Sequence, residues 1–290
     1  NILNFVPMDP INFSNTILNH KDLAAILFTG SSSVFDDIYK KTGNNIDLYN
    51  NYVRLVGETG GKNYHFIHNN VKDLRRVVKL TIESAYNYSG QKCSACSRVY
   101  IPKSLFDRFI SIYYDEIDNF KKTQENYGLI NENSFENTIK HLNRLKNDKN
   151  INFLYGGECF IKNNQYYVEP TLINCSKHNN IPFQKEYFAP ILSCYVYDDK
   201  KIDRAIALCM NNSYSLTGSV FSNDKKFINS FTNKSMYSCG NFYINDKSTG
   251  SVVGQQPFGG SGKSGTNDKA GDINLLYRLF NQRNIKEAII

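Results

Sequence analysis

The chain has 290 residues, of which 41% are hydrophobic and 21% charged, and 34 Lys and Arg outnumber 27 Asp and Glu. This composition can bury a substantial core and excludes a disordered chain. The positive charges are dispersed, with no basic run interleaved with aromatic residues, which favours an ordinary solvated surface over a nucleic-acid partner. No apolar run approaches the length of a membrane span, and no targeting segment is visible.

The first predicted element is an apolar run at residues 24–28, which is typical of a buried parallel strand. It leads into a Thr-Gly-Ser-Ser-Ser turn, where a helix is expected to begin. Backbone N–H groups at a helix start suit a pyrophosphate, so Gly30 and Ser31 are candidate cofactor-binding residues. Ser clusters are also ordinary helix caps, and Phe35 rules out a standard Gly-x-Gly-x-x-Gly loop.

Two Gly-containing turns carry a carboxylate and a thiol. Glu58 is set in Gly-Glu-Thr-Gly-Gly-Lys, between two apolar runs, and Cys93 follows in Gly-Gln-Lys-Cys-Ser-Ala-Cys-Ser-Arg. We expect the neighbouring Lys92 and Arg98 to favour the reactive thiolate of Cys93. A thiol that forms a covalent intermediate needs a base to bring in water, and Glu58 is the candidate.

Periodicity places Cys93 just beyond a helix. Apolar residues recur at three- and four-residue intervals between Asp73 and Ser89, which predicts an amphipathic helix that stops at Gly90. A strand at 99–101 and a helix with a capping box at Ser104 follow. Further elements are expected as helices near 135–148 and 201–211 and strands near 190–197, 216–221 and 241–244. This alternation predicts an α/β fold with a largely parallel sheet.

Seven cysteines, an odd and irregular set in a chain that needs no disulfides, indicate a reducing compartment. Cys93 and Cys96 form a Cys-x-x-Cys pair, but no second pair or suitably spaced His pair accompanies it, so we expect no metal site. Cys96 is predicted to be a packing thiol, and Cys194 a core residue of a strand.

The two turns together resemble signatures of the aldehyde dehydrogenase superfamily. Its Glu-Leu-Gly-Gly-Lys-like and Gly-Gln-x-Cys elements are matched at residues 58–62 and 90–93. Its cofactor-domain turn, its Glu-x-Phe-Gly-Pro element and its late Pro-Phe-Gly-Gly turn are matched at residues 28–31, 186–190 and 257–260. Ala189 replaces the usual Gly of the second of these. Two longer strings, residues 90–98 and residues 240–251 followed by 253–260, resemble the Δ1-pyrroline-5-carboxylate dehydrogenase branch.

The resemblance implies an aldehyde dehydrogenase-like α/β fold, with the largely parallel sheet of a catalytic domain and the last part of a Rossmann-like cofactor domain. Residues 1–56 would be the carboxy-terminal part of the NAD-binding domain, and residues 57–247 the catalytic domain. Residues 248–290 would hold the substrate-anchor loop and the carboxy-terminal segment. Superfamily chains are much longer and carry a Trp-Asn-Phe-Pro-like element whose Asn helps hold the oxyanion. This chain has no Trp, and we expect it to be a carboxy-terminal portion.

The resemblance also implies NAD-dependent oxidation of L-glutamate γ-semialdehyde to L-glutamate in proline catabolism. The aldehyde would form a thioester on Cys93, which water activated by Glu58 hydrolyses. NAD would be held by Glu186 at the nicotinamide ribose, by Phe188 near the nicotinamide ring, and by Gly30 and Ser31. The residues expected to bind the aldehyde substrate are Lys92, Ser94, Gly250, Ser251 and Phe258.

For the full-length enzyme the resemblance implies a homo-oligomer, a dimer or higher, located in the mitochondrial matrix of a eukaryote or otherwise in the cytoplasm. Two alternatives stay open. One is an incomplete fragment or pseudoenzyme that folds and oligomerises without binding NAD. The other is a cysteine hydrolase, which would require His65 or His68 within hydrogen-bond reach of Cys93, although their alternating strand favours ordinary packing.

Overall fold

The computed structural model describes residues 2–123 and 128–289. A seven-stranded sheet with the order β12-β11-β3-β4-β9-β8-β5 forms the centre of the larger lobe. Its strands are β3 (Asn63–Ile67), β4 (Cys96–Pro102), β5 (Ile151–Tyr155), β8 (Thr171–Cys175), β9 (Ile191–Tyr197), β11 (Thr217–Phe221) and β12 (Asn241–Ile244). Only the edge pairing of β5 with β8 is antiparallel among the described strands of this sheet. The prediction of a largely parallel α/β sheet is therefore confirmed.

Helices cover both faces of this sheet. α3 (Leu74–Tyr86) and α4 (Phe106–Thr123) share one buried apolar cluster with alternate residues of the strands. α5 (Glu132–Lys146), α6 (Ile202–Met210) and α7 (Lys225–Lys234) contribute to a second cluster on the other face. Phe66 lies within this second cluster, with its ring 4.9 Å from that of Phe231. Strand alternation therefore builds two cores, one on each side of the sheet.

The predicted helix before Cys93 is present as α3, capped by Asp73, whose side chain accepts from the backbone of Arg76 at 3.0 Å. It ends at Tyr86, and a short 3₁₀ turn runs on to Gly90, which has φ +68°. A Cβ at Gly90 would lie 2.5 Å from the carbonyl oxygen of Ala189. Glycine is needed here because the turn to Cys93 passes against the backbone of Ala189.

The other predicted elements form within a few residues of their expected bounds, with one local correction. Ser104 does not close a capping box, because its hydroxyl and its backbone N–H donate to the carboxylate of Asp199 at 2.5 and 3.1 Å. Cys194 and Cys96 are buried in β9 and β4, as expected of packing thiols. The periodicity did not single out β5, β8, α7 or the hairpin of β6 (Cys159–Lys162) and β7 (Gln165–Val168).

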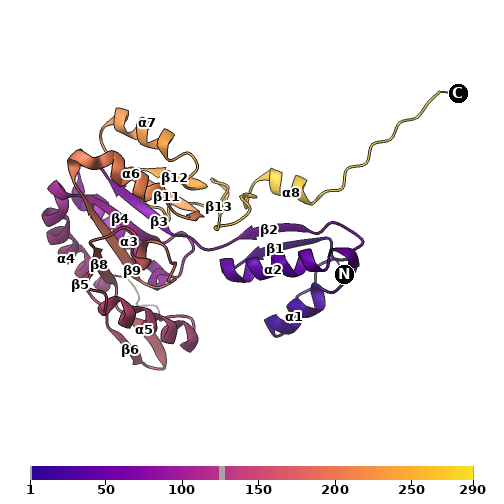
Figure 1. Cartoon of the computed structure of the whole chain (residues 1–290), viewed down its shortest axis with the longest axis horizontal. Coiled ribbons are helices and arrows are strands. Elements are labelled where there is room, and N and C mark those ends of the chain that lie inside the picture. Colours follow the sequence, from indigo (N-terminus) through magenta and orange to yellow (C-terminus); the bar gives the residue numbers. More distant parts are fainter. Residues whose placement is uncertain (1, 124–127, 290) are drawn as a thin grey trace.

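A smaller unit extends from the large lobe (Figure 1). It contains α1 (Pro10–Ile17), α2 (Ser32–Asn44) and the parallel pair β1 (Ala25–Thr29) and β2 (Arg54–Glu58). α2 begins as predicted, with Ser31 Oγ accepting from Val34 N at 3.3 Å. The expectation that the run at 24–28 is buried is wrong, because Leu27 is 55% exposed and β2 is the only strand that pairs with β1 among the described residues.

The last part of the chain returns to both units. β13 (Ser261–Gly262) pairs with β10 (Tyr214–Ser215) of the large lobe, and α8 (Ile273–Leu279) lies near β2 (Figure 1). Residues 280–289 have no regular secondary structure. Phe280 and Asn281 accept hydrogen bonds from Arg54 of β2, and the chain then extends away from both units (Figure 1). Residues 262–266 therefore run between the two units and contact each of them.

Candidate active site

A cavity of about 530 Å³ brings together residues far apart in the sequence. The predicted site residues that line it are Cys93, Glu58, Ser94, Ser251 and Phe258. Thr249, Gln255 and Gln256 also line it; they belong to the matched strings near residues 240–260 but are not among the predicted site residues. A thiol, a carboxylate and several neutral hydrogen-bonding side chains therefore share one space, which is the combination that covalent catalysis followed by hydrolysis needs.

Glu58 is held at the end of β2, beside the expected cofactor turn. Gly30 N donates to the carbonyl oxygen of Glu58 at 3.2 Å, and Glu58 also forms a backbone bridge with Gly265. Partial burial raises the pKa of the Glu58 carboxyl, while the positive charge of Lys269 acts in the opposite direction. A raised pKa suits a group that must accept a proton during the reaction.

Cys93 is positioned by a side chain that the sequence analysis missed. Asn63 Nδ2 donates to the carbonyl oxygens of Cys93 at 2.7 Å and Ala95 at 2.8 Å. Asn63 Oδ1 accepts from Thr217 N at 3.0 Å, so the same amide also joins β3 to β11. A Cβ at Gly61 would lie 2.5 Å from the Cys93 carbonyl oxygen. The turn that carries Cys93 is therefore fixed against the sheet.

The expectation that nearby cations activate the thiol is wrong. Burial, followed by the charges of Glu58 and Glu186, raises the pKa of Cys93 to about 11. The Lys92 ammonium lies over the ring of Tyr88, 4.7 Å from its centroid. Arg98 is buried and donates to the carbonyl oxygen of Lys62 at 2.7 Å. Both cations are turned to other partners, so the resting thiol is protonated.

Glu186, Phe188 and Lys92 line a second, smaller cavity of about 20 Å³, separate from the one that holds Cys93. Glu186 Oε1 accepts from Gly61 N at 2.9 Å. Phe188 is 46% exposed and has φ +52°. Beside them Lys62 is buried, with Nζ 5.2 Å from the centroid of the Tyr187 ring and no hydrogen-bond partner among the described residues.

The loop that was expected to bind the substrate closes the larger cavity. Gly250 N donates to the carbonyl oxygen of Lys247 at 2.9 Å, which makes a turn, and Gly250 is absent from the described cavity lining. Phe258 forms two backbone hydrogen bonds with Ala270, at 2.9 and 2.8 Å. The Lys269 ammonium donates to the carbonyl oxygens of Gly240 and Gly259. These bonds fix Phe258 at the cavity wall.

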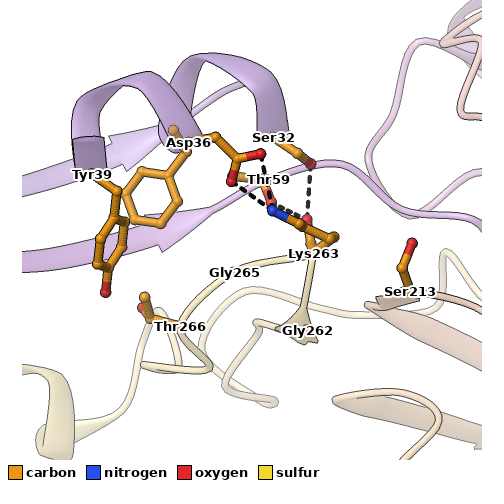
Figure 2. Close-up of a pocket in the computed structure, with 10 residues that line it drawn as sticks. Ser32, Asp36, Tyr39, Thr59, Ser213, Gly262, Lys263, Gly265 and Thr266 are labelled. Carbon is orange, nitrogen blue, oxygen red and sulfur yellow. Dashed lines mark hydrogen bonds and ion pairs between the residues drawn. The ribbon is translucent and has the colours of Figure 1, made fainter. Parts of the chain in front are cut away.

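Figure 2 shows another pocket, of about 410 Å³, between α2 and the segment 262–266. Lys263 Nζ reaches both carboxylate oxygens of Asp36, at 2.8 and 2.9 Å. The carbonyl oxygen of Lys263 accepts from Ser32 Oγ at 2.8 Å and from Thr59 Oγ1 at 2.6 Å. These contacts attach the start of α2 to the residue that follows Glu58.

Several groups suit parts of a dinucleotide cofactor. Gly30 and Ser31 are exposed and lie directly before the first turn of α2, and a helix start favours a phosphate. The Glu186 carboxylate can accept from hydroxyl groups of a ribose, and the exposed Phe188 ring offers an apolar face. These residues therefore fit a pyrophosphate, a ribose and a planar ring.

The cysteine hydrolase alternative fails on geometry. Both ring nitrogens of His65 are taken, by Thr81 Oγ1 at 2.9 Å and by Ser248 N at 3.0 Å. His68 Nδ1 lies 2.8 Å from Ser222 Oγ. Neither ring is bonded to the Cys93 thiol in the part of the chain that the structure describes, so neither can serve as its base.

Residues 2–123 and 128–289 contain no group of three or more His, Cys, Asp or Glu side chains placed to hold a metal ion. Over the same residues no helix is both long enough and apolar enough to pass through a bilayer.

Comparison with known proteins shows the family of the chain. The sequence model of the aldehyde dehydrogenase family matches residues 1–284. The chain belongs to this family. The resemblance found in the sequence motifs is thereby confirmed.

Curated relatives of this aldehyde dehydrogenase chain include delta-1-pyrroline-5-carboxylate dehydrogenases. The mitochondrial delta-1-pyrroline-5-carboxylate dehydrogenase of Dictyostelium discoideum is 40% identical over 300 residues, which cover 100% of this chain and 53% of that protein. The mitochondrial delta-1-pyrroline-5-carboxylate dehydrogenase of Homo sapiens is also 40% identical, over 296 residues that cover 99% of this chain and 52% of the relative. The chain thus spans about half the length of the curated relatives it matches.

Solved structures confirm the aldehyde dehydrogenase-like fold. The delta-pyrroline-5-carboxylate dehydrogenase from Mycobacterium tuberculosis bound with NAD superposes with a TM-score of 0.86 at 34% identity. The superposition covers 97% of this chain and 52% of that structure. A 1-pyrroline-5-carboxylate dehydrogenase from Thermus with bound NAD gives a TM-score of 0.80 at 25% identity, over 91% of this chain and 51% of that structure.

Proposed function

We propose that the protein oxidises L-glutamate γ-semialdehyde to L-glutamate with NAD⁺ in proline catabolism, through a thioester on Cys93. The observation that carries this proposal is that Cys93, Glu58 and Ser251 line one cavity. The chain is also 40% identical to proteins named delta-1-pyrroline-5-carboxylate dehydrogenases, which supports this aldehyde as the substrate.

In this reaction the Cys93 sulfur attacks the aldehyde carbon and forms a hemithioacetal. Since the pKa of Cys93 is about 11, the thiol proton must leave as the bond forms, and it passes to solvent water, so Glu58 stays ionised for the later hydrolysis. When bound, NAD⁺ supplies the acceptor for the hydride of this carbon. Glu58 then removes a proton from the water that hydrolyses the thioester, and L-glutamate is released.

We propose that Glu186 holds the nicotinamide ribose, that Phe188 packs near the nicotinamide ring, and that Gly30 and Ser31 bind the pyrophosphate region. The hydrogen bond from Gly61 to Glu186 supports this assignment, because it holds the carboxylate beside the turn that follows Glu58. Relatives whose structures carry NAD share the fold, which supports the choice of cofactor.

For the substrate we propose that Ser251, Ser94 and the backbone at Gly250 bind its polar end, while Phe258 shields the reacting carbon. Neutral donors can hold a carboxylate without burying a fixed positive charge. Lys92 contributes to substrate binding only by long-range attraction for the carboxylate. It cannot contact the substrate directly, because its ammonium lies over the ring of Tyr88 and does not line the cavity of Cys93.

The domain division at residues 56–57 and 247–248, a homo-oligomeric full-length enzyme and residence in the mitochondrial matrix are further parts of the proposal. The mitochondrial names of the curated relatives support the last of these. The competing proposal is a fragment or pseudoenzyme that folds but does not turn over. It is favoured by one observation, that the chain spans about half the length of its relatives.

The test is the formation of NADH from L-glutamate γ-semialdehyde by three proteins: this chain, the full-length gene product and its Cys93→Ala variant. The proposal predicts turnover by the full-length protein and none by the variant. An absence of turnover from both this chain and the full-length protein would favour the pseudoenzyme. Turnover that survives Cys93→Ala would rule out the thioester route.

A further inference from the structure

His65 lies in a buried hydrogen-bond network between the Cys93 turn and the anchor loop (residues 250–258). Its side chain is 0% exposed on β3. The ring touches α3 through Thr81 Oγ1, at 2.9 Å, and accepts from Ser248 N at 3.0 Å. Ser248 is also 0% exposed and lies two residues before the anchor loop. One ring therefore connects the sheet, a helix and the start of the loop.

The direction of each hydrogen bond in this network can be assigned. A backbone N–H only donates, so Nε2 of His65 accepts from Ser248 and Nδ1 carries the hydrogen. Nδ1–H then donates to Thr81 Oγ1, whose own hydrogen goes to the carbonyl oxygen of Val77 at 2.8 Å. Burial lowers the pKa of His65 to about 3, so the ring stays neutral with this tautomer.

Ser248 carries the connection to the thiol. Its hydroxyl donates to the carbonyl oxygen of Ser94 at 3.1 Å and accepts from Ser84 Oγ at 2.9 Å. Ser94 is the residue after Cys93, and its carbonyl oxygen also accepts from Thr217 Oγ1 at 3.4 Å. Ser248 is thus held by His65 through its backbone and holds the Cys93 turn through its side chain.

We propose that His65 is a positioning residue that, through Ser248, sets the spacing between the Cys93 thiol and the anchor loop. The inference rests on the proposed function, in which the thiol must meet the aldehyde carbon while the loop holds the other end of the same molecule. Small misplacement of either group lowers the rate strongly. His65 can affect the reaction only through its hydrogen-bond partners, because it is buried and is absent from the described lining of the cavity.

The test compares His65→Asn, His65→Gln and a matched control, His68→Asn, in the full-length protein. Asparagine keeps a polar atom near the Nδ1 position but cannot reach Ser248, whereas the glutamine carbonyl reaches the Nε2 position. Among the described residues, His68 makes one ring hydrogen bond of the same kind, to Ser222, and has no bond to Ser248. We expect His65→Asn to lower kcat/KM for the aldehyde about tenfold, with KM for NAD⁺ unchanged. His65→Gln should restore part of the loss, and His68→Asn should behave as wild type.

A second measurement does not depend on turnover: the rate at which iodoacetamide alkylates Cys93, followed by mass spectrometry of its peptide. His65→Asn should change this rate several-fold and His65→Gln should return it toward wild type. If wild type forms no NADH, the proposed function fails, and the alkylation rates alone decide the inference.

The proposed role of His65 would be overturned if wild type and His65→Asn had equal alkylation rates and equal kcat/KM. It would also be overturned if His65→Gln lost as much kcat/KM as His65→Asn. If His65→Asn does not fold, Ser248→Ala, which removes the hydroxyl links to Ser94 and Ser84 but keeps the backbone N–H that His65 accepts from, must reproduce the change, while Ser222→Ala must not.

Discussion

The side-chain amide of Asn63 donates to the carbonyl oxygen of Cys93 at 2.7 Å, and Asn63 Oδ1 accepts from Thr217 N at 3.0 Å. A second bond from the same amide reaches Ala95 O at 2.8 Å. One buried side chain therefore satisfies carbonyl groups on both sides of Ser94 and joins them to two strands. The position of the thiol is set by the sheet, which is more rigid than a surface loop.

Asn63→Ala should therefore lower both activity and stability. It leaves a backbone N–H and two carbonyl groups without their buried partner, which costs about 1–3 kcal/mol of unfolding free energy. We expect kcat to fall about tenfold or more, since the thiol is no longer held in place. The measurements are steady-state kinetics and thermal denaturation.

The control for Asn63 is Asn45→Ala. Asn45 also donates two hydrogen bonds, to Leu18 O and Asn19 Oδ1, but it lies in the small unit away from the thiol. It should lose stability while keeping its kcat. Equal loss of kcat in the two variants would mean that Asn63 acts only through overall stability.

The raised pKa of Cys93 predicts a steep pH dependence of its reactivity. With a pKa of about 11, the thiolate fraction, and hence the alkylation rate, rises about tenfold for each pH unit throughout the neutral and mildly alkaline range. Glu58→Gln removes one of the charges that raise this pKa, so the variant should react faster than wild type at the same pH. A rate that levels off near neutral pH would show that another group activates the thiol.

Lys269 should control the acid limb of the pH–rate profile. Its charge lowers the pKa of Glu58, while burial raises it. Glu58 acts as a base only when ionised, so activity is lost as the pH falls through its pKa. Lys269→Met removes the opposing charge, and the acid limb should move to higher pH.

Lys269→Arg keeps the charge and serves as the control for the position of this limb. The height of the profile should fall in both variants, because Lys269 also holds Gly240 and Gly259. An acid limb at the same pH in Lys269→Met and wild type would contradict the proposed role of Glu58.

Lys62 should reduce stability near neutral pH. Burial, followed by the charge of Arg98, lowers its pKa to about 7 from 10.5. Between these values the unfolded chain binds a proton that the folded chain does not, so stability rises with pH across this window. Lys62→Met removes this term and should raise the unfolding free energy by about 1–4 kcal/mol near neutral pH. The gain should shrink as the pH approaches 10.5.

Thermal denaturation across this pH range measures the difference. The exposed Lys140, which makes only an i,i+4 ion pair with Glu136, provides the control variant Lys140→Met. Its curve should follow wild type. Parallel curves for Lys62→Met and wild type would show that folding does not lower the pKa of Lys62.

Much of the fold follows from local patterns. The amphipathic period of α3, the apolar run of β1 and the alternation of strands and helices are properties of short segments, and each was predicted within a few residues. The motifs pair Cys93 with Glu58, and in the structure both residues line one cavity.

The surroundings of the thiol could not be predicted in the same way. Lys92 and Arg98 are close to Cys93 in sequence, but the first turns to Tyr88 and the second to the carbonyl oxygen of Lys62. Asn63 and His65 accept hydrogen bonds from Thr217 and Ser248, which are more than 150 positions away in the chain. Side-chain direction and burial depend on such long-range pairing, which a single sequence does not reveal.

The most direct test of the account is to trap the acyl group on Cys93. Full-length Glu58→Gln would be mixed with NAD⁺ and L-glutamate γ-semialdehyde, quenched in acid and analysed by peptide mass spectrometry, beside the Cys93→Ala variant. If Cys93 is the nucleophile and Glu58 the base for hydrolysis, Glu58→Gln forms about one NADH per site and keeps the glutamyl group on the peptide that contains Cys93. Steady turnover by Glu58→Gln with no adduct, or an adduct that also forms in Cys93→Ala, would contradict it.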